Sequence, residues 1–529
     1  MNEVVLRMIA SAVTACLFCL STVKLLGALQ QSGYKGGVFS AWLKRKDNLY
    51  FNRLAVLCLL LALSSAITSI CFSFLGLRGA LLLSATPFLG IVLLFILADS
   101  KYALKVPLKR TARIQRLFVV YLFFTACIAY AFIAFLSVLA KWNGSFLYGL
   151  IAYAPYALMP VLMPAILRLA NAAEGVFENA WNKKFVKRAG QVLDESQMVR
   201  IGIVGSYGKT SVKNILKTVL SEKFTVVETP ESYNTPIGIA KTVFSPEFEG
   251  KQVFLAEMGA RKEGDIAELC ALVKPDYALF TGVCKQHIHT FKSIEGVFEE
   301  KSKILTYTAK KVVCGEGLKA LVKEENAIFA DSGYIQDLQL NPSNTSFTLA
   351  LGEEKIPVCV PLLGNAAAEN ISLCVRLAKE LGMTAEEIAR GLEKVQPVPH
   401  RLQLLEHNGV YILDDGYNCN PKGAKEGIDA LRRFSGRKCA VTPGIVECGV
   451  LEEEINGELG KALANANLDK VILVGETLVG AVKKGYFEAN GDRERLVIVK
   501  TLAEAQAELG AWVQTGDAVL FLNDLPDVY

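Results

Sequence analysis

The sequence lacks the features that several classes of protein require. It has no basic stripe interleaved with aromatic residues, although its formal net charge is +5, and this argues against nucleic-acid binding. The only C-x-x-C pair, Cys16 and Cys19, lies inside an apolar run, so the thirteen cysteines argue for reduced structural thiols rather than zinc ligands or disulfides. No internal repeat, low-complexity tract or signal-peptide cleavage site is present, so the first apolar run is interpreted as a retained helix.

Apolar runs are abundant, and they crowd into the first third of the 529 residues. Hydrophobic residues make up 52% of the chain, which is high for a soluble protein. Five segments approach the length of about 20 residues that crosses a bilayer. They are residues 8–29, 54–75, 79–98, 117–140 and 147–170. Arg7 lies at the start of the first segment and Lys24 lies inside it, so four spans with one interfacial helix are an alternative.

The loops between these segments differ in charge. The first and third loops carry the basic residues Lys35, Lys44, Arg45, Lys46 and Arg53, and Lys101, Lys105, Lys109, Arg110, Arg113 and Arg116. The second and fourth loops carry only Arg78 and Lys141. Because basic loops stay in the cytoplasm, the pattern predicts a multi-pass protein of the cell membrane with its N-terminus outside and the rest of the chain, after the fifth span, inside.

Beyond residue 199 short apolar strands alternate with amphipathic helices, which predicts parallel, doubly wound sheets. The predicted strands are residues 200–204, 253–257, 277–281 and 311–314, and then 410–413, 438–441, 470–474 and 518–522. We therefore expect an α-helical transmembrane bundle followed by two α/β domains. The predicted boundaries are 1–172 for the bundle, 173–198 for a juxtamembrane linker helix, 199–399 for a central ATP-binding domain and 400–529 for a Rossmann-like C-terminal domain.

The loop Gly205-Ser206-Tyr207-Gly208-Lys209-Thr210 is the strongest chemical signal in the chain. It joins a predicted strand to a predicted helix, where backbone N–H groups and the helix dipole favour phosphate. Lys209 adds a positive charge for the phosphates, and the Thr210 hydroxyl is suited to Mg²⁺. Ile203 stands where the longer P-loop pattern has glycine, so this is a shortened variant. By itself it predicts a site for the phosphates of a nucleotide with Mg²⁺.

With Ser211, this loop resembles the nucleotide loop of the Mur ligases, the enzymes that build the stem peptides of peptidoglycan. Further blocks resemble that family, and its MurF type in particular, in the same order over residues 199–480. They are Thr229 to Gly238 (an Asn-rich loop), Glu257-Met258-Gly259 (an acidic Mg²⁺ site), Thr281 to Ile304, Arg401, and Leu413 to Pro421, which is similar to the D-D-S-Y-N-A-N-P segment.

The resemblance implies a role for individual positions. The implied ATP-binding residues are Gly205, Ser206, Tyr207, Gly208, Lys209, Thr210, Ser211, Asn370, Arg401 and Asp415. The implied metal ligands are Thr210, Glu257, His287 and Lys301, the last as a carbamate, and the implied catalytic residues are Lys209, Lys301 and His287. The implied substrate-binding residues are Asn234, Thr235, Tyr417, Asn418 and Asn420.

The resemblance implies an ADP-forming ligase that phosphorylates a substrate carboxylate and joins the acyl phosphate to an amine. Three departures from the family are visible. Gly364-Asn365-Ala366-Ala367 replaces a Gly-x-His-Asn segment, residues 522–527 lack a Lys-Gly-Ser-Arg segment, and apolar spans replace the domain that binds the UDP-sugar. The loss of that domain favours a lipid-linked acceptor, although a UDP-linked one stays open.

We therefore expect a membrane-anchored ligase that contacts membrane lipid and adds an amino acid or dipeptide to a UDP-linked or polyprenyl-linked muramyl peptide. A poly-γ-glutamate synthase-like ligase is one alternative, against which the segment at residues 413–421 and the complete C-terminal domain weigh. A membrane-tethered nucleotide-binding scaffold or sensor is the other, for which Ala366-Ala367 and the altered tail leave room. The sequence identifies no protein partner.

Overall fold

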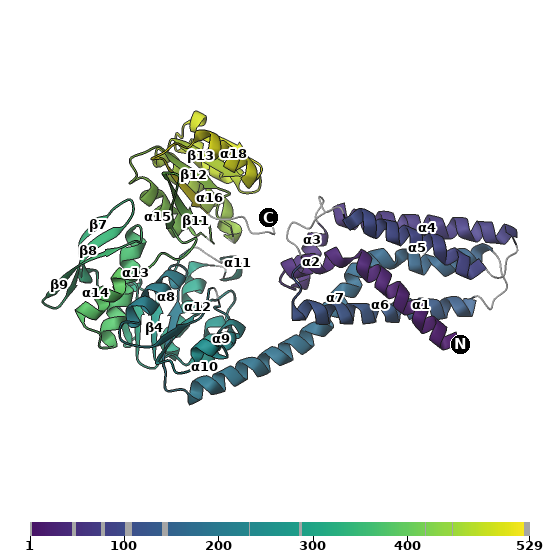
Figure 1. The fold of residues 1–529 in the computed structure, drawn as a ribbon, viewed down its shortest axis with the longest axis horizontal. Coiled ribbons are helices and arrows are strands. Elements are labelled where there is room, and N and C mark those ends of the chain that lie inside the picture. Colours follow the sequence, from purple (N-terminus) through teal and green to yellow (C-terminus); the bar gives the residue numbers. More distant parts are fainter. Residues whose placement is uncertain are drawn as a thin grey trace. The chain divides into compact units, whose positions relative to one another are not determined.

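The computed structural model describes the chain except residues 1–2, 45–48, 76–79, 101–107, 140–145, 232, 285–287, 292, 418, 447 and 523–529. It contains two compact units, Met1–Asn182 and Lys183–Leu525, each described by itself (Figure 1). Several residues of the sequence analysis lie outside the described residues. They are Arg45, Lys46, Arg78, Lys101, Lys105, Lys141, His287, Asn418 and the tail at 523–527.

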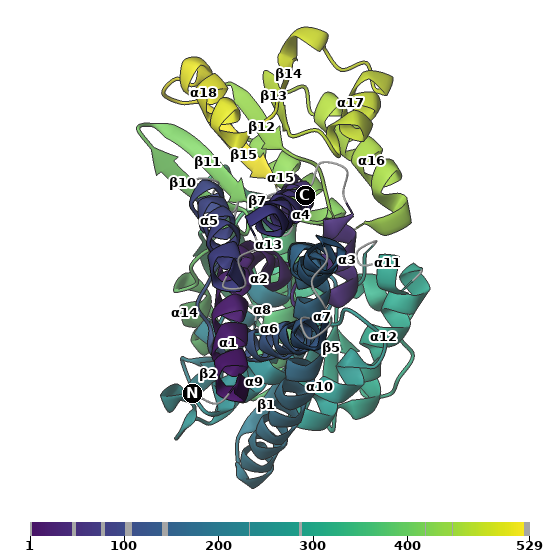
Figure 2. The same ribbon diagram turned by 90° about the vertical axis from the view of Figure 1, so that its right-hand side faces the viewer.

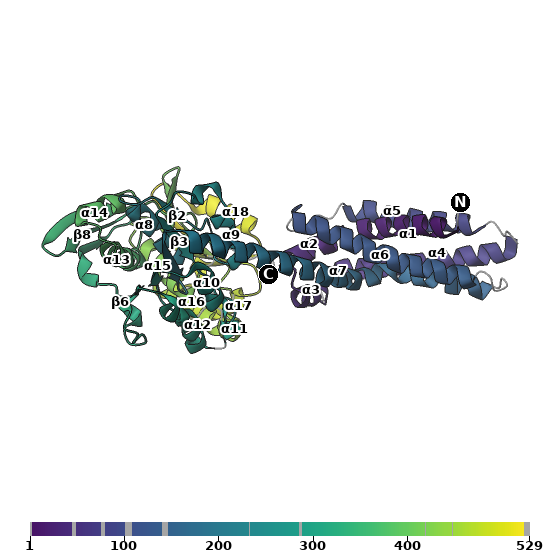
Figure 3. The same cartoon turned by 90° about the horizontal axis from the view of Figure 1, so that it is seen from below.

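The first unit is entirely helical in its described residues. Its helices are α1 (Glu3–Ser21), α2 (Val23–Gln31), α3 (Gly36–Leu43), α4 (Leu49–Leu75), α5 (Ala80–Ser100), α6 (Ala112–Leu139) and α7 (Phe146–Glu195). Helix α1 packs against α5 and α6, and α4 packs against α5, so the long helices run alongside one another (Figure 3). Buried Phe18, Leu57 and Tyr121 contribute to a common core, while many leucines and valines face outward.

The first predicted span is broken in the structure. Helices α1 and α2 meet at Thr22 with a bend of 53° rather than continuing as one rod. The Thr22 hydroxyl donates to the carbonyl of Phe18 over 2.7 Å, and the Ser21 hydroxyl donates to the same carbonyl over 2.9 Å. Side chains that bond to carbonyls three or four residues back compete with the helical ladder and bend helices.

Two helices of the described residues are long and apolar enough to cross a membrane, within Ala112–Phe135 and Ala157–Glu195. The bent pair α1 and α2 makes a third if it counts as one span. The described apolar parts of α4 and α5, Asn52–Ser64 and Leu89–Asp99, are shorter. The described residues thus account for two or three of the five predicted spans, and the number five stays a prediction.

Helix α7 does not end where the composition becomes polar near residue 173, so the predicted linker helix is the last part of a longer one. A change from apolar to charged side chains alters the preferred surroundings of a helix but leaves its backbone hydrogen bonds intact. Beyond Asn182, Phe185, Ala189 and Leu193 of α7 pack into a core cluster of the second unit.

The central domain is built on a parallel sheet with the strand order β2-β3-β1-β4-β5-β6, as the alternation of strands and helices predicts. These strands are β1 (Val199–Val204), β2 (Val226–Glu228), β3 (Val253–Glu257), β4 (Tyr277–Phe280), β5 (Lys311–Cys314) and β6 (Ala327–Phe329). Successive side chains of a strand point to opposite faces. Leu255 therefore packs on one face and Phe254 on the other.

Helices cover both faces of this sheet (Figure 1). Helices α8 (Lys209–Leu220), α13 (Asn365–Glu380) and α14 (Ala385–Glu393) lie on one face. Helices α9 (Pro236–Val243), α10 (Asp265–Val273) and α12 (Ile294–Tyr307) and the end of α7 lie on the other, and the short α11 spans Ile288–Phe291.

An antiparallel sheet in the central domain was not predicted. It consists of β7 (Ile335–Leu340), β8 (Thr345–Leu351) and β9 (Glu354–Val360). Phe347, Leu349, Ala350 and Val358 of β8 and β9 are buried, whereas no residue of β7 is buried.

The C-terminal domain has a six-stranded sheet with the order β10-β11-β15-β12-β13-β14, in which only β10 is antiparallel to its neighbour. Its strands are β10 (Gln403–His407), β11 (Val410–Asp415), β12 (Lys438–Thr442), β13 (Lys470–Val474), β14 (Leu496–Val499) and β15 (Ala518–Leu522). Helices α15 (Pro421–Leu431), α16 (Glu452–Asn465) and α17 (Val479–Glu488) cover one face and α18 (Leu502–Trp512) the other (Figure 2).

Candidate active site

The predicted nucleotide loop, residues 205–210, is called the P-loop from here on. It connects the end of β1 to the start of α8, and its conformation requires two glycines. Gly208 caps α8 with φ +74°, and a Cβ atom there would lie 2.8 Å from Oδ1 of Asn370. Gly205 has φ +155°, and a Cβ atom there would lie 1.9 Å from the Thr281 hydroxyl. Because glycine has no Cβ, it alone fits these close approaches. Asn370 therefore lies beside the loop, and its predicted contact with the nucleotide stays a prediction.

The loop offers several groups suited to phosphate. The Lys209 ammonium donates to the carbonyl oxygen of Gly205 over 2.9 Å, and it lies at the N-terminus of α8. The Ser206 hydroxyl is buried, and among the described residues it has no nitrogen or oxygen hydrogen-bond partner. A buried hydroxyl without such a partner and a lysine at a helix N-terminus both fit an anionic ligand such as the phosphates of ATP.

Glu257 is the centre of the predicted metal site, and its side chain is only 2% exposed. Oε2 accepts a hydrogen bond from the Thr210 hydroxyl over 3.1 Å and lies 3.3 Å from Nζ of Lys213. Oε1 accepts a hydrogen bond from the Asn234 amide over 3.4 Å. The structure thus brings together three of the predicted site residues, Thr210, Asn234 and Glu257, from three separate segments.

The donor set around Glu257 fits Mg²⁺, which prefers hard oxygen ligands. Thr210 and Glu257 supply a hydroxyl and a carboxylate oxygen within hydrogen-bond distance of each other. Within the described part of the chain no three His, Cys, Asp or Glu side chains converge on one point. Of the predicted ligand set only Glu257 and His287 are of those types, and His287 lies outside the described residues.

Lys301 of α12 is buried beside the P-loop, and its Nζ donates to the Gly205 carbonyl over 3.2 Å. Lys209 donates to the same carbonyl, so two ammonium groups share one acceptor. Burial, reinforced by the charge of Lys209, lowers the pKa of Lys301 to about 7. A neutral amine reacts with carbon dioxide to form a carbamate, so this setting is compatible with the predicted modification, which stays a prediction.

The predicted residues of the C-terminal domain form a second group. Arg401 donates to the carbonyl of Tyr417 over 2.7 Å and lies over the Tyr417 ring. Asp415 is buried and accepts from the backbone N–H of Leu402 over 3.1 Å. Burial lowers the pKa of Lys209, and the nearby positive charge of Arg401 lowers it further, whereas the Glu257 carboxylate raises it. Arg401 therefore acts electrostatically on the P-loop lysine.

Two predicted substrate residues have structural partners instead. The Thr235 hydroxyl accepts from the N–H of Gly238 and caps α9, and the Asn420 side chain accepts from the N–H of Gly423 and caps α15. Threonine and asparagine are common N-cap residues because their side chains satisfy N–H groups at the start of a helix. These contacts account for both residues without a substrate, so their substrate role stays a prediction.

Lys213 was missed by the sequence analysis. It is 3% exposed, pairs with Glu257, and donates to the carbonyls of Thr229 over 2.6 Å and Glu231 over 2.8 Å. It lies three residues after Thr210, a spacing that places two side chains on the same side of a helix, and this was the available signal.

The contacts between the central and C-terminal domains were also missed. Lys422 of α15 lies over the ring of the P-loop residue Tyr207, with Nζ 4.3 Å from the ring centroid, and it pairs with Glu369. The Ala366 N–H donates to Glu426 over 3.3 Å, in the segment that departs from the family pattern. Nothing in the local sequence pairs these residues.

Comparison with known proteins agrees with this arrangement. Residues 203–378 match the model of the Mur ligase middle domain, and residues 400–523 match that of the Mur ligase, glutamate ligase domain, together more than half of the chain. The chain belongs to the Mur ligase family. The UDP-N-acetylmuramoyl-tripeptide–D-alanyl-D-alanine ligase of Bacillus subtilis is 27% identical over 303 residues, which are 55% of this chain and 64% of that protein. The Escherichia coli ligase of the same name is 26% identical over 301 residues, covering 52% of this chain and 64% of that protein.

Solved Mur ligase structures have the same fold. The MurF ligase of Thermotoga maritima in complex with ADP is 26% identical and superposes with a TM-score of 0.59, covering 66% of this chain and 81% of that one. MurF from Acinetobacter baumannii superposes with a TM-score of 0.60 at 23% identity, covering 66% of this chain and 78% of that one. The chain thus spans less than two thirds of the two curated relatives' length but most of the solved structures.

Replacing Lys209 with methionine should lower ATP-dependent phosphate release at least about 100-fold, because a positive charge at the phosphates is lost. The measurement is phosphate release by the full-length protein. Lys217→Met is the matched control, since Lys217 lies on the same helix and pairs with Glu228 at the surface. Equal loss in both variants would contradict a special role of Lys209.

Replacing Lys213 with methionine should destabilise the second unit by about 3 kcal/mol, roughly 4 °C in melting temperature for a unit of this size, because Glu257 would stay buried without its cation. Thermal unfolding of the full-length protein measures this. Lys274→Met, which removes an exposed pair with Asp194, should shift the melting temperature by no more than about 1 °C. A small effect at Lys213 would show that Glu257 does not depend on it.

Carbamate on Lys301 should increase as the pH rises through about 7, because the folded protein loses the Lys301 proton near that pH and only the neutral amine reacts. Carbon-13 NMR of protein equilibrated with labelled bicarbonate measures the carbamate. The signal should vanish in Lys301→Arg and persist in Lys303→Arg, whose lysine pairs with Glu300 on the same helix. A signal that Lys301→Arg retains would refute the assignment.

Proposed function

We propose that the protein is a membrane-anchored, ATP-dependent ligase that forms an amide bond on a peptidoglycan precursor. The proposal is carried by the contact of Thr210 with Glu257 beside Lys209, because this places a hydroxyl, a carboxylate and an ammonium group around one phosphate-binding loop. The similarity to ligases named for joining D-alanyl-D-alanine to a UDP-N-acetylmuramoyl tripeptide supports the same reaction class here.

The residues of the site divide the work of such a reaction. Lys209 and the N–H groups at the start of α8 hold the ATP phosphates, and Thr210 with Glu257 would hold Mg²⁺, which would neutralise phosphate charge. Transfer of the γ-phosphate to the acceptor carboxylate gives an acyl phosphate. Attack by the amine then forms the amide and releases phosphate. Lys213 is a positioning residue, because it contacts Glu257 and the loop at Thr229.

The first unit is proposed to be the membrane anchor. Its described helices expose large apolar side chains, such as Leu59, Leu94 and Phe123, each at least 60% exposed. Water disfavours such a surface, whereas a bilayer does not. The basic residues of the first and third loops support an N-terminus outside the cell and a second unit in the cytoplasm, where ATP is available.

A ligation assay tests the proposed function. Full-length protein in lipid nanodiscs is incubated with ATP, Mg²⁺, D-alanyl-D-alanine and either a UDP-linked or a polyprenyl-linked muramyl tripeptide, and mass spectrometry identifies the product. We expect an extended peptide and ADP, with the polyprenyl-linked acceptor preferred. Lys209→Met is the inactive control.

The assay also separates the alternatives. The assay is repeated with single amino acids in place of the dipeptide. If the protein binds ATP but forms no product with either acceptor and either kind of amine, the proposal is overturned and a nucleotide-binding scaffold is favoured. If the protein forms a polymer of glutamate without a muramyl acceptor, it acts like a poly-γ-glutamate synthase. Extension of only the UDP-linked acceptor would keep the ligase and exclude the lipid-linked substrate.

A further inference from the structure

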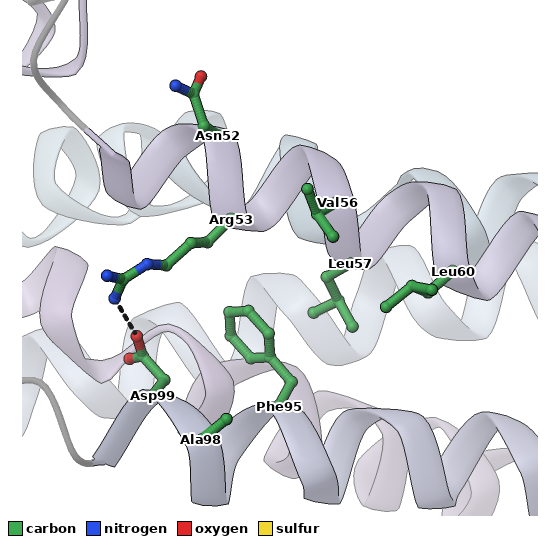
Figure 4. Close-up of a pocket in the computed structure, with 8 residues that line it drawn as sticks. All are labelled: Asn52, Arg53, Val56, Leu57, Leu60, Phe95, Ala98 and Asp99. Atoms are coloured by element: carbon green, nitrogen blue, oxygen red, sulfur yellow. Dashed lines mark hydrogen bonds and ion pairs between the residues drawn. The ribbon is translucent and has the colours of Figure 1, made fainter.

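A groove in the first unit lies between the facing sides of α4 and α5, with a volume of about 400 Å³ (Figure 4). Pockets for small ligands span about 300–1,000 Å³, so this one accommodates a small ligand or part of a larger one. The polar and the apolar residues of its lining are segregated. Polar and charged side chains lie at one end, and apolar side chains form the remaining walls.

Asn52, Arg53 and Asp99 line the polar end, where Arg53 and Asp99 point toward each other while the Asn52 amide points away from α5 (Figure 4). Nη1 of Arg53 lies 3.3 Å from one oxygen of the buried Asp99 carboxylate, and Lys24 of α2 lies 2.9 Å from the other. Two cationic side chains therefore meet at one carboxylate. A guanidinium has five N–H donors in a planar fork, so Arg53 can contact Asp99 and a phosphate at the same time. The Arg53 side chain is 31% exposed, which leaves part of it accessible.

The apolar walls are formed by Val56, Leu57 and Leu60 of α4 and Phe95 of α5. From Asn52 to Leu60 the groove follows α4 for about 12 Å, given the rise of 1.5 Å per residue. Val56 is 55% exposed and Leu60 is 46% exposed, so this wall is open to the surroundings of the unit. Such a wall suits an alkyl or isoprenoid chain and offers little to a water-soluble ligand.

The polar end of the groove belongs to the basic end of the helical unit. Arg53 lies in the first basic loop of the sequence, and Lys109 of the third basic loop is hydrogen-bonded to Gln30 of α2. Arg113 and Arg116 pair with the buried Glu174 of α7, close to where this helix leaves the unit. In the proposed orientation this end is cytoplasmic, which is the side on which ATP is used.

We propose that this groove binds the phosphate-bearing lipid carrier of the acceptor, with the phosphate at Arg53 and the first part of its apolar chain against Leu57, Leu60 and Phe95. The inference rests on the proposed ligase function and specifies how the substrate is held. The order of the lining, a cation followed by an apolar wall, matches a molecule in which a phosphate is joined directly to a long hydrocarbon chain.

Lipid binding by the full-length protein tests the groove without any ligation step. The protein is placed in phosphatidylcholine nanodiscs that contain a polyprenyl phosphate, and native mass spectrometry measures the bound fraction. Arg53→Gln, which removes the charge, and Leu60→Trp, which fills the groove, should each weaken binding about tenfold. Arg110→Gln and Leu63→Trp are matched controls, since both residues are exposed and neither lines the groove. Both should bind within about twofold of the wild type.

If all four variants bind polyprenyl phosphate equally well, the groove is not its binding site, even where the wild-type protein extends a polyprenyl-linked acceptor. In a competition experiment, phosphatidylglycerol, an anionic lipid with two chains, is added to the same nanodiscs. If it displaces the bound polyprenyl phosphate as well as added polyprenyl phosphate does, the assignment of the groove to the carrier is overturned. Binding that depends on Arg53 and Leu60 would support the groove even where the wild type extends neither acceptor, a result that counts against the proposed ligase alone. Monodisperse nanodiscs of each variant show that the substitutions leave the protein folded.

Discussion

The active site depends on one buried carboxylate. Glu257 ends β3 inside the protein, where an ionised side chain loses most of its hydration and needs nearby cations and hydrogen-bond donors. Thr210 and Lys213 meet it from α8, and Asn234 meets it from the loop before α9. The phosphate-binding loop, the loop at residues 229–234 and the central sheet are thereby held in one arrangement. The carboxylate that we propose to hold Mg²⁺ also organises the segments around it.

The P-loop carries a second constraint, which concerns charge. Lys209 and Lys301 donate to the same carbonyl of Gly205, and Arg401 acts electrostatically on Lys209. This concentration of positive charge is costly without anions and becomes favourable when phosphates are present. Burial lowers the pKa of Lys301, and the charge of Lys209 lowers it further. The same concentration of charge suits the transfer of a phosphoryl group between two negatively charged substrates.

Much of the second unit could be predicted from sequence because its signals are local. The bounds of β3, β5, β13 and β15 match the predicted strands, since each is a short apolar run between polar segments. The sheet β7–β8–β9 was missed because β7 has no buried residue and the pairing of the strands depends on partners elsewhere in the domain. The break at Thr22 was missed for a similar reason, because the apolar pattern continues through it while two hydroxyl groups bend the backbone.

The sequence by itself determined the chemistry of the nucleotide loop, the alternation that specifies parallel sheets and the apolar first third of the chain. Each of these depends on residue type and short-range spacing, which the linear order contains. Only the tertiary structure decided that Lys213 reaches Glu257 and that Lys422 covers Tyr207. The pairing of Lys422 with Tyr207 joins residues more than two hundred positions apart, and only the packing of whole domains brings them together.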